Sequence, residues 1–167
     1  MIFAIYNLLT MGFAVGLLIA IRAHTDNRRR TTGALAASFL IAEGVFGFAT
    51  VFFPEGAPGA PIAGTGVVHI VLAGLSSLTT MLTILLLAFW FGTAPGLKGY
   101  GRYSFASVAV VFISGGLAAA SIATHGSFGG LAERITIGVF LLWMFVVALK
   151  LYRMSDSGTE ASRQAHA

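Results

Sequence analysis

The 167-residue sequence has no cysteine and very few charged residues. The lack of cysteine excludes disulfides, thiolate metal sites and cysteine nucleophiles. Only 10% of the residues are Asp, Glu, Lys or Arg, whereas soluble domains contain about 25%. So few charges cannot cover a water-facing surface, and lipid must therefore cover much of the protein.

Hydrophobic residues make up 57% of the chain and are grouped in five long runs. Each run reaches the length of about 20 residues with which a helix crosses the hydrocarbon core of a bilayer. Strands are a poor alternative, because the runs do not alternate and an open strand leaves unpaired backbone groups in lipid. The sequence therefore predicts an all-α polytopic membrane protein, a bundle of five transmembrane helices at about residues 2–21, 31–53, 66–91, 103–124 and 131–152.

These runs are expected to form one transmembrane helical domain over residues 1–154, because no stretch remains for a second domain. The first run has no basic segment in front of it, so we interpret it as a retained helix rather than a signal peptide. Residues 155–167 are small and polar, which predicts a disordered cytoplasmic tail.

Nine of the ten basic residues fall on one side of this predicted bundle. The positive-inside rule places that side in the cytoplasm, with the N-terminus outside and the C-terminus inside. Membrane topology thus accounts for the net charge of +4, and no nucleic-acid partner is expected. We expect a multi-pass protein of the plasma membrane whose partners are membrane lipids, with a homo-oligomer or a larger membrane complex as further possibilities.

Polar residues recur at helical spacing inside the runs. The third run carries His69, Ser76, Thr80 and Thr83 on one stripe, and the fourth carries Ser107, Ser114, Ser121 and His125. Polar groups are costly in lipid, so such stripes are expected to face the bundle interior. Glu43, Ser76, Ser114 and Trp143 lie about ten residues from the predicted outer ends, which is roughly 15 Å at 1.5 Å per residue. The pattern predicts a polar pocket that opens outward, with Glu43 at its floor.

Glu43 is the most informative of these residues. A charged carboxylate at mid-membrane costs at least about 2.5–3.5 kcal/mol. We therefore expect Glu43 to be neutral, or hydrogen-bonded to Ser76 or Ser114. Two interpretations stay open: a group that carries a proton or binds a ligand, and a protonated side chain that holds helices together.

The predicted ligand-binding set is Glu43, His69, Ser76, Ser114, His125, Glu133, Arg134 and Trp143. His69, His125 and Glu133 (or Glu55) could in principle ligate zinc, but no HxxxH or HExxH spacing supports a metal, and none is expected. Glu133 and Arg134 either clamp a polar substrate or serve the helix start and the lipid headgroups. The sequence assigns no catalytic residue and no cofactor.

Small residues in the runs predict close helix packing. Gly12 and Gly16 form a GxxxG pattern in the first run, which favours contact between two helices. We expect this contact to lie within the protein, and a homodimer seam is the alternative.

Two short motifs resemble a known membrane family. Phe53-Pro54-Glu55 and Gly64-Thr65-Gly66-Val67-Val68-His69, followed by Gly130-Leu131-Ala132-Glu133-Arg134 and Trp143, resemble signatures of the multi-pass membrane family called domain of unknown function 998. Glu55-Gly56 stands where that family tends to have an Asp, and the first of its two histidines is replaced. The resemblance implies a bundle of six helices, one more than the runs predict. It implies no activity.

Three functions are compatible with these features. The first is a membrane protein that binds or moves a small molecule or lipid through the polar pocket, coupled to a proton at Glu43. The second is a metal-dependent intramembrane lipid hydrolase that resembles ceramidase-like hydrolases. The third is a structural or assembly subunit of a membrane complex. Whether the protein is an enzyme stays open at this point.

Overall fold

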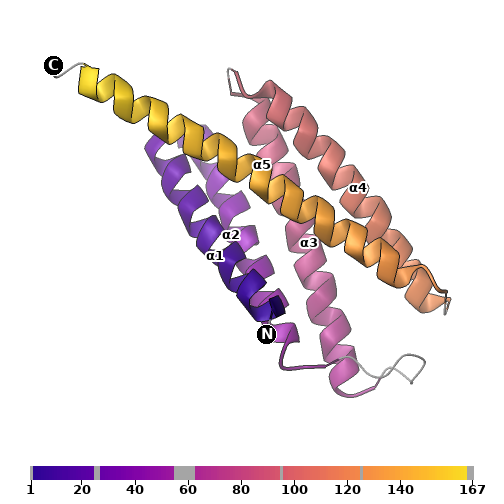
Figure 1. Cartoon of the computed structure of the whole chain (residues 1–167). Helices are drawn as coiled ribbons and strands as arrows, with labels where there is room; N and C mark the ends of the chain where they lie inside the picture. The colour runs from indigo at the N-terminus through magenta and orange to yellow at the C-terminus, as the bar shows by residue number, and fades with distance from the viewer. Residues whose placement is uncertain (1, 25–26, 55–62, 95, 125, 165–167) are drawn as a thin grey trace.

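The computed structural model describes residues 2–24, 27–54, 63–94, 96–124 and 126–164 (Figure 1). The five helices in these residues are α1 (Ile2–His24), α2 (Asn27–Thr50), α3 (Thr65–Gly92), α4 (Lys98–Ala123) and α5 (Gly129–Gln164). All five contain stretches long and apolar enough to cross a bilayer, and the described residues include no strand. The predicted all-α bundle of five membrane-spanning helices is confirmed.

Two glycines with positive φ angles lie at ends of α3. Gly64 (φ 55°) precedes the first residue of α3, and Gly96 (φ 74°) lies in the connection to α4. Side chains with a Cβ atom rarely adopt this left-handed conformation. Glycine at these two positions therefore lets the backbone turn sharply at the edge of the membrane.

The end of α2 and the start of α4 differ from the predicted apolar runs. α2 ends at Thr50, because residues 51–53 form tight turns in which Val51, Phe52 and Phe53 donate to carbonyls three residues earlier. α4 begins at Lys98, ahead of the apolar run that starts at residue 103. Helical hydrogen bonding does not depend on side-chain polarity, so a helix can extend beyond the part that lies in lipid.

α5 is the longest helix, with 36 residues. Its apolar span covers Gly129–Met154, and the helix then continues to Gln164. The disordered tail predicted for residues 155–167 overlaps this segment and stays a prediction; the structure describes the backbone of 155–164. Glu160, Ala161, Arg163 and Gln164 are residue types with high helix propensity, whereas residues 155–159 are not.

Each helix packs against the next one along the chain, and α5 also touches α1. In Figure 1, α5 runs obliquely across the bundle, from the end of α4 towards the end of α1. α3 and α4 approach closely at Gly101, where an added Cβ would lie 2.9 Å from the Ala88 carbonyl oxygen and 3.0 Å from the Gly92 nitrogen. Because these are backbone atoms, the contact depends on the missing side chain.

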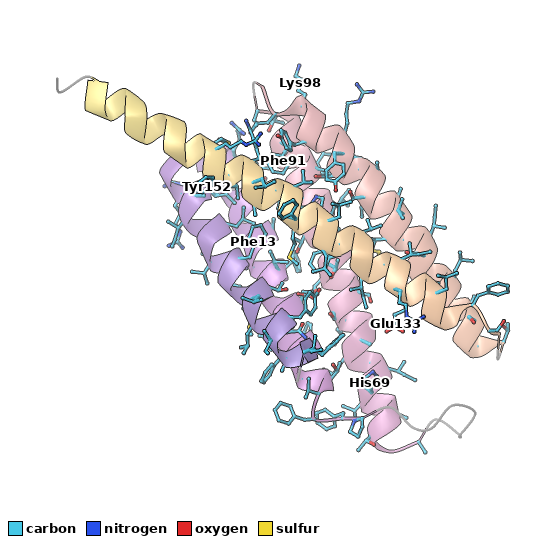
Figure 2. The ribbon with its side chains drawn as sticks, viewed as in Figure 1. Phe13, His69, Phe91, Lys98, Glu133 and Tyr152 are labelled. Carbon is cyan, nitrogen blue, oxygen red and sulfur yellow. The ribbon has the colours of Figure 1, made fainter. Side chains whose placement is uncertain are left out.

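The apolar core lies where the C-terminal halves of α1 and α3 meet the N-terminal half of α2 and the middle parts of α4 and α5. Its largest fully buried side chains are Leu17, Ile21, Leu40, Ile84, Leu87, Phe91, Val111, Trp143 and Val147. Figure 2 shows Phe91 and Tyr152 in this part of the molecule, near Lys98 at the start of α4. Towards the opposite end, large apolar side chains such as Val71, Leu117 and Leu131 are mostly exposed, as expected for surfaces that face lipid.

The GxxxG pattern of α1 does not mediate contact inside the chain. An added Cβ at Gly12 or Gly16 would meet no atom within 4 Å, and both glycines are exposed. The prediction that this pattern packs within the protein is therefore wrong. α1 instead packs on α2 through Asn7 and Met11, which contact Gly44 and Gly47 of α2.

Candidate functional site

Glu43 lies on α2 with only 2% of its surface exposed. Its Oε1 atom accepts hydrogen bonds from the Tyr6 hydroxyl of α1 at 3.4 Å and from the Ser76 hydroxyl of α3 at 3.5 Å. Both distances are long for bonds between hydroxyl and carboxyl groups. The carboxyl group thus joins three helices through weak contacts, and the bond expected from Ser76 is present.

Two oxygen acceptors at this junction have no hydrogen-bond partner among the described residues: Glu43 Oε2 and Asn7 Oδ1. Asn7 is fully buried on α1, and its amide nitrogen donates to the Phe3 carbonyl at 2.8 Å. More than nine in ten buried backbone groups and most buried polar side-chain atoms in proteins are hydrogen-bonded. Two buried acceptors without a partner at the contact between α1 and α2 are therefore unusual.

The contact between α1 and α2 holds these two residues at one interface. Gly47 lies one helical turn after Glu43, and an added Cβ at Gly47 would collide with Asn7 Oδ1. An added Cβ at Gly44 would lie 2.5 Å from Met11 Cγ and 3.0 Å from the Asn7 carbonyl oxygen. The two glycines of α2 therefore let Asn7 approach the same face of α2 that carries Glu43.

Neighbouring threonines do not provide the missing donors. The hydroxyls of Thr10, Thr50 and Thr79 donate to backbone carbonyls of their own helices at 3.1, 2.7 and 2.9 Å. A hydroxyl has one proton to donate, so these three are already committed. The donors aimed at the carboxyl group are those of Tyr6 and Ser76, and both reach Oε1.

Ser114 belongs to a different cluster. Its hydroxyl oxygen lies 2.7 Å from that of Thr136, so the pair joins α4 to α5. The same hydroxyl lies 2.8 Å from the Val110 carbonyl, and no hydrogen bond to Glu43 is present. The alternative in which Glu43 bonds to Ser114 is therefore wrong.

Trp143 also ties α5 to α4. Its indole nitrogen donates to the Ser104 hydroxyl at 2.9 Å, with both residues fully buried. Its ring stacks on Phe140 with centroids 6.1 Å apart and an interplanar angle of 15°. Trp143 is thus already hydrogen-bonded and packed, which gives it a clear structural role.

His69 connects the start of α3 to the turn that follows α2. Its Nδ1 atom donates to the Phe53 carbonyl at 2.8 Å, so the Nε2 atom of a neutral ring is the acceptor. Figure 2 shows His69 on α3 and Glu133 on α5, both away from the Lys98 end of the molecule. Glu133 and Arg134 are exposed. His125 and Glu55 lie outside the described residues.

The predicted site residues form two separate hydrogen-bonded clusters in the part of the chain that the structure describes. Glu43 and Ser76 lie at the junction of α1, α2 and α3, whereas Ser114 and Trp143 lie between α4 and α5. Within the described residues, no group of three His, Asp or Glu side chains could hold a metal ion. The assignment of these residues to a ligand stays a prediction.

A cavity of about 320 Å³ lies between the end of α4 and the start of α5; it contains Ser121 of the predicted polar stripe but none of the predicted ligand-binding residues. Its lining is Leu117, Ala120, Ser121, Thr124, Gly126, Phe128, Leu131, Ala132 and Ile135. We refer to this space as the α4–α5 hollow. The wall is mostly apolar, which differs from the polar pocket expected from the sequence.

A family model described as a protein of unknown function, DUF998, matches residues 1–150. The chain belongs to the DUF998 family. The match is wider than the motifs that first indicated it, because it includes all of α1 and most of α5. No curated protein and no solved structure was found to match. In this DUF998 protein, the hydrogen bond from His69 to the Phe53 carbonyl connects the motif that ends at His69 to the motif that begins at Phe53.

Sequence reasoning missed Tyr6 and Asn7 as members of the Glu43 junction. Both lie in an apolar helix, where an amide side chain is unusual, and Thr10 follows one turn later. Polar side chains at neighbouring positions of a membrane span indicate an interior face. That signal is present in the first run beside the glycine pattern, which by itself predicts only a packing role.

Proposed function

We propose that this DUF998 protein is a plasma-membrane protein that binds and releases a proton at Glu43 inside the bilayer. The observation that carries the proposal is the buried Oε2 atom of Glu43, which has no hydrogen-bond donor among the described residues. Protonation of Oε2 would convert this unpaired acceptor into a hydrogen-bond donor. Ionisable groups inside a membrane commonly mark proton relays and ligand sites.

The surroundings of Glu43 favour a proton over a larger ligand. The residue is 2% exposed, and side chains from α1 and α3 contact the same carboxyl oxygen. The α4–α5 hollow, which has room for a larger molecule, is lined by residues of other helices. We therefore narrow the small-molecule hypothesis to a proton at this junction.

Proton exchange at Glu43 offers a way to change helix packing. The hydrogen-bond partners of Oε1 belong to α1 and α3, whereas Glu43 itself is on α2. A charged carboxylate attracts hydroxyl donors more strongly than a neutral carboxyl group does. Gain or loss of the proton would thus alter how firmly three helices are held together, in the manner of a two-state switch.

The proposal includes the orientation predicted from the loops, with the N-terminus outside. Arg29 lies against Trp90, with its guanidinium 5.1 Å from the ring centroid and its Nη2 atom donating to the Trp90 carbonyl at 3.4 Å. Lys150 lies 5.6 Å from the ring of Tyr100. These cation contacts support a common basic end of the bundle, which we assign to the cytoplasm.

Infrared difference spectroscopy of the purified protein in lipid vesicles tests proton binding. Between neutral and alkaline buffer, where ordinary exposed carboxyl groups stay ionised, the C=O stretch of a protonated carboxylic acid should appear in one state and vanish in the other. Glu43→Gln should remove this band, whereas the matched variant Glu133→Gln, altered at an exposed carboxyl group, should keep it.

Two results contradict proton exchange at Glu43. One is a wild-type spectrum without any pH-dependent carboxylic-acid band, and the other is a band that persists unchanged in Glu43→Gln. Circular dichroism of both variants checks that the helices remain folded. Repeating the titration with sodium or potassium as the only cation shows whether a metal ion displaces the proton.

A further inference from the structure

The polar side chains that line the α4–α5 hollow, Ser121 and Thr124, lie at one end of it. The candidate span of α4 ends at Ser121, and that of α5 begins at Gly129. The lining residues deepest within these spans, Leu117 and Ile135, are apolar, whereas Thr124, Gly126 and Phe128 lie between the two spans. The hollow is therefore mostly apolar, and the Ser121 and Thr124 hydroxyls lie at the end where the spans stop.

Hydrogen bonds and a close contact hold the wall of the hollow at the end that carries Ser121. The Ser121 hydroxyl donates to the Gly126 carbonyl at 2.8 Å, and the Gly126 amide donates to the Ser121 carbonyl at 2.8 Å. Gly129 also contacts the Ser121 side chain, since an added Cβ there would lie 3.3 Å from its Oγ atom. These reciprocal contacts tie Gly126 and Gly129 to the last turn of α4.

Arg134 supplies a positive charge beside this opening. It is exposed and lies one turn after Leu131, which lines the hollow. Residues three apart in a helix are neighbours, and an arginine fork suits phosphate groups. Glu133 carries the opposite charge, but the residues one turn before it, Gly129 and Gly130, do not line the hollow. The cation is thus the charge nearer to the opening.

We propose that the α4–α5 hollow binds one phospholipid with an anionic headgroup. One acyl chain occupies the apolar part between Leu117 and Ile135, and the phosphate lies at the membrane surface beside Arg134. The volume of about 320 Å³ is at the lower end of the range for ligand pockets, which suits part of one chain rather than a whole lipid. The site does not depend on Glu43, which lies on α2.

Native mass spectrometry with added phosphatidylglycerol tests this site. Ala120→Trp should fill the hollow and weaken retention of the lipid by about tenfold, because Ala120 is part of the lining. The matched control is Ala119→Trp, since Ala119 is exposed but does not line the hollow. Equal retention in the two variants would overturn the proposal.

The headgroup contact is tested separately. Arg134→Gln should reduce retention of phosphatidylglycerol several-fold and leave retention of uncharged diacylglycerol unchanged. Arg102→Gln, which removes an exposed arginine near the start of α4, should affect neither lipid. A loss of phosphatidylglycerol in Arg102→Gln that matches the loss in Arg134→Gln would contradict a headgroup site at Arg134.

A measurement on the unaltered protein covers the case in which the tryptophan variants fail to fold. A phosphatidylglycerol with a photoactivatable diazirine near the end of one acyl chain is incorporated with the wild-type protein and irradiated. Peptide mapping should locate the cross-links between residues 117 and 135. Cross-links confined to α1, α2 or α3 would refute the assignment.

Discussion

Single side chains determine how α5 is attached to the rest of the bundle. The bond from the Trp143 indole to the Ser104 hydroxyl is 2.9 Å long and lies in a fully buried environment. Lipid does not drive apolar side chains together, so packing and interhelical hydrogen bonds have a larger share of the stability. The same residue thus supplies a large ring for packing and one directed polar contact.

The substitution Trp143→Phe tests this contact. It should lower the free energy of unfolding by about 1–3 kcal/mol, because the Ser104 hydroxyl loses its partner and the smaller ring leaves a space. Chemical unfolding in mixed micelles measures the change. A double-mutant cycle with Ser104→Ala should give a coupling energy of about 0.6–1.7 kcal/mol, whereas a coupling near zero would show that the bond contributes nothing.

At the scale of elements, the close approach of α3 and α4 depends on Gly101. An added Cβ there would lie within 3.1 Å of backbone atoms of Ala88 and Gly92. Backbone atoms cannot rotate away as a side chain can, so the two helices would have to move apart. The Phe89 and Phe105 rings, which pack edge to face with centroids 5.2 Å apart, lie at the same interface.

Gly101→Ala should therefore destabilise the protein by about 1–3 kcal/mol, the usual cost of overpacking. Gly116→Ala is the matched control on the same helix, because an added Cβ there meets no atom within 4 Å. This control should be neutral or slightly stabilising, since alanine favours helix over glycine. Thermal unfolding of both variants provides the comparison, and equal melting temperatures would count against the close contact.

The positions of the five helices were predictable from hydropathy, because the thickness of the bilayer sets the length of each apolar run. The partners of each polar residue were not, since a stripe on one helix does not say which neighbour it faces. Ser76 and Ser114 have similar predicted depths, yet Ser76 bonds to Glu43 and Ser114 pairs with Thr136. The rotation of each helix about its axis and the order in which the helices lie side by side decide which polar residues meet. Both arise from packing between distant parts of the chain.

The whole molecule offers a direct test of orientation, because the sequence contains no cysteine. Single cysteines can be placed at Arg102, beside the start of α4, and at Ser127, between α4 and α5. The proposed topology predicts that a membrane-impermeant maleimide added to intact cells labels Ser127→Cys. Arg102→Cys should be labelled after the membrane is opened, and the reverse pattern would invert the assignment.

The neighbour order of the helices has a consequence for biosynthesis. Each helix packs most extensively against the helix made just before or after it, whereas the contact between α1 and α5 joins helices far apart in the sequence. Contacts between segments close in sequence form quickly, because little loop entropy is lost. The bundle can therefore assemble stepwise during translation, with each newly inserted span finding a partner already in the membrane, whereas the contact between α1 and α5 forms after α5 has been made.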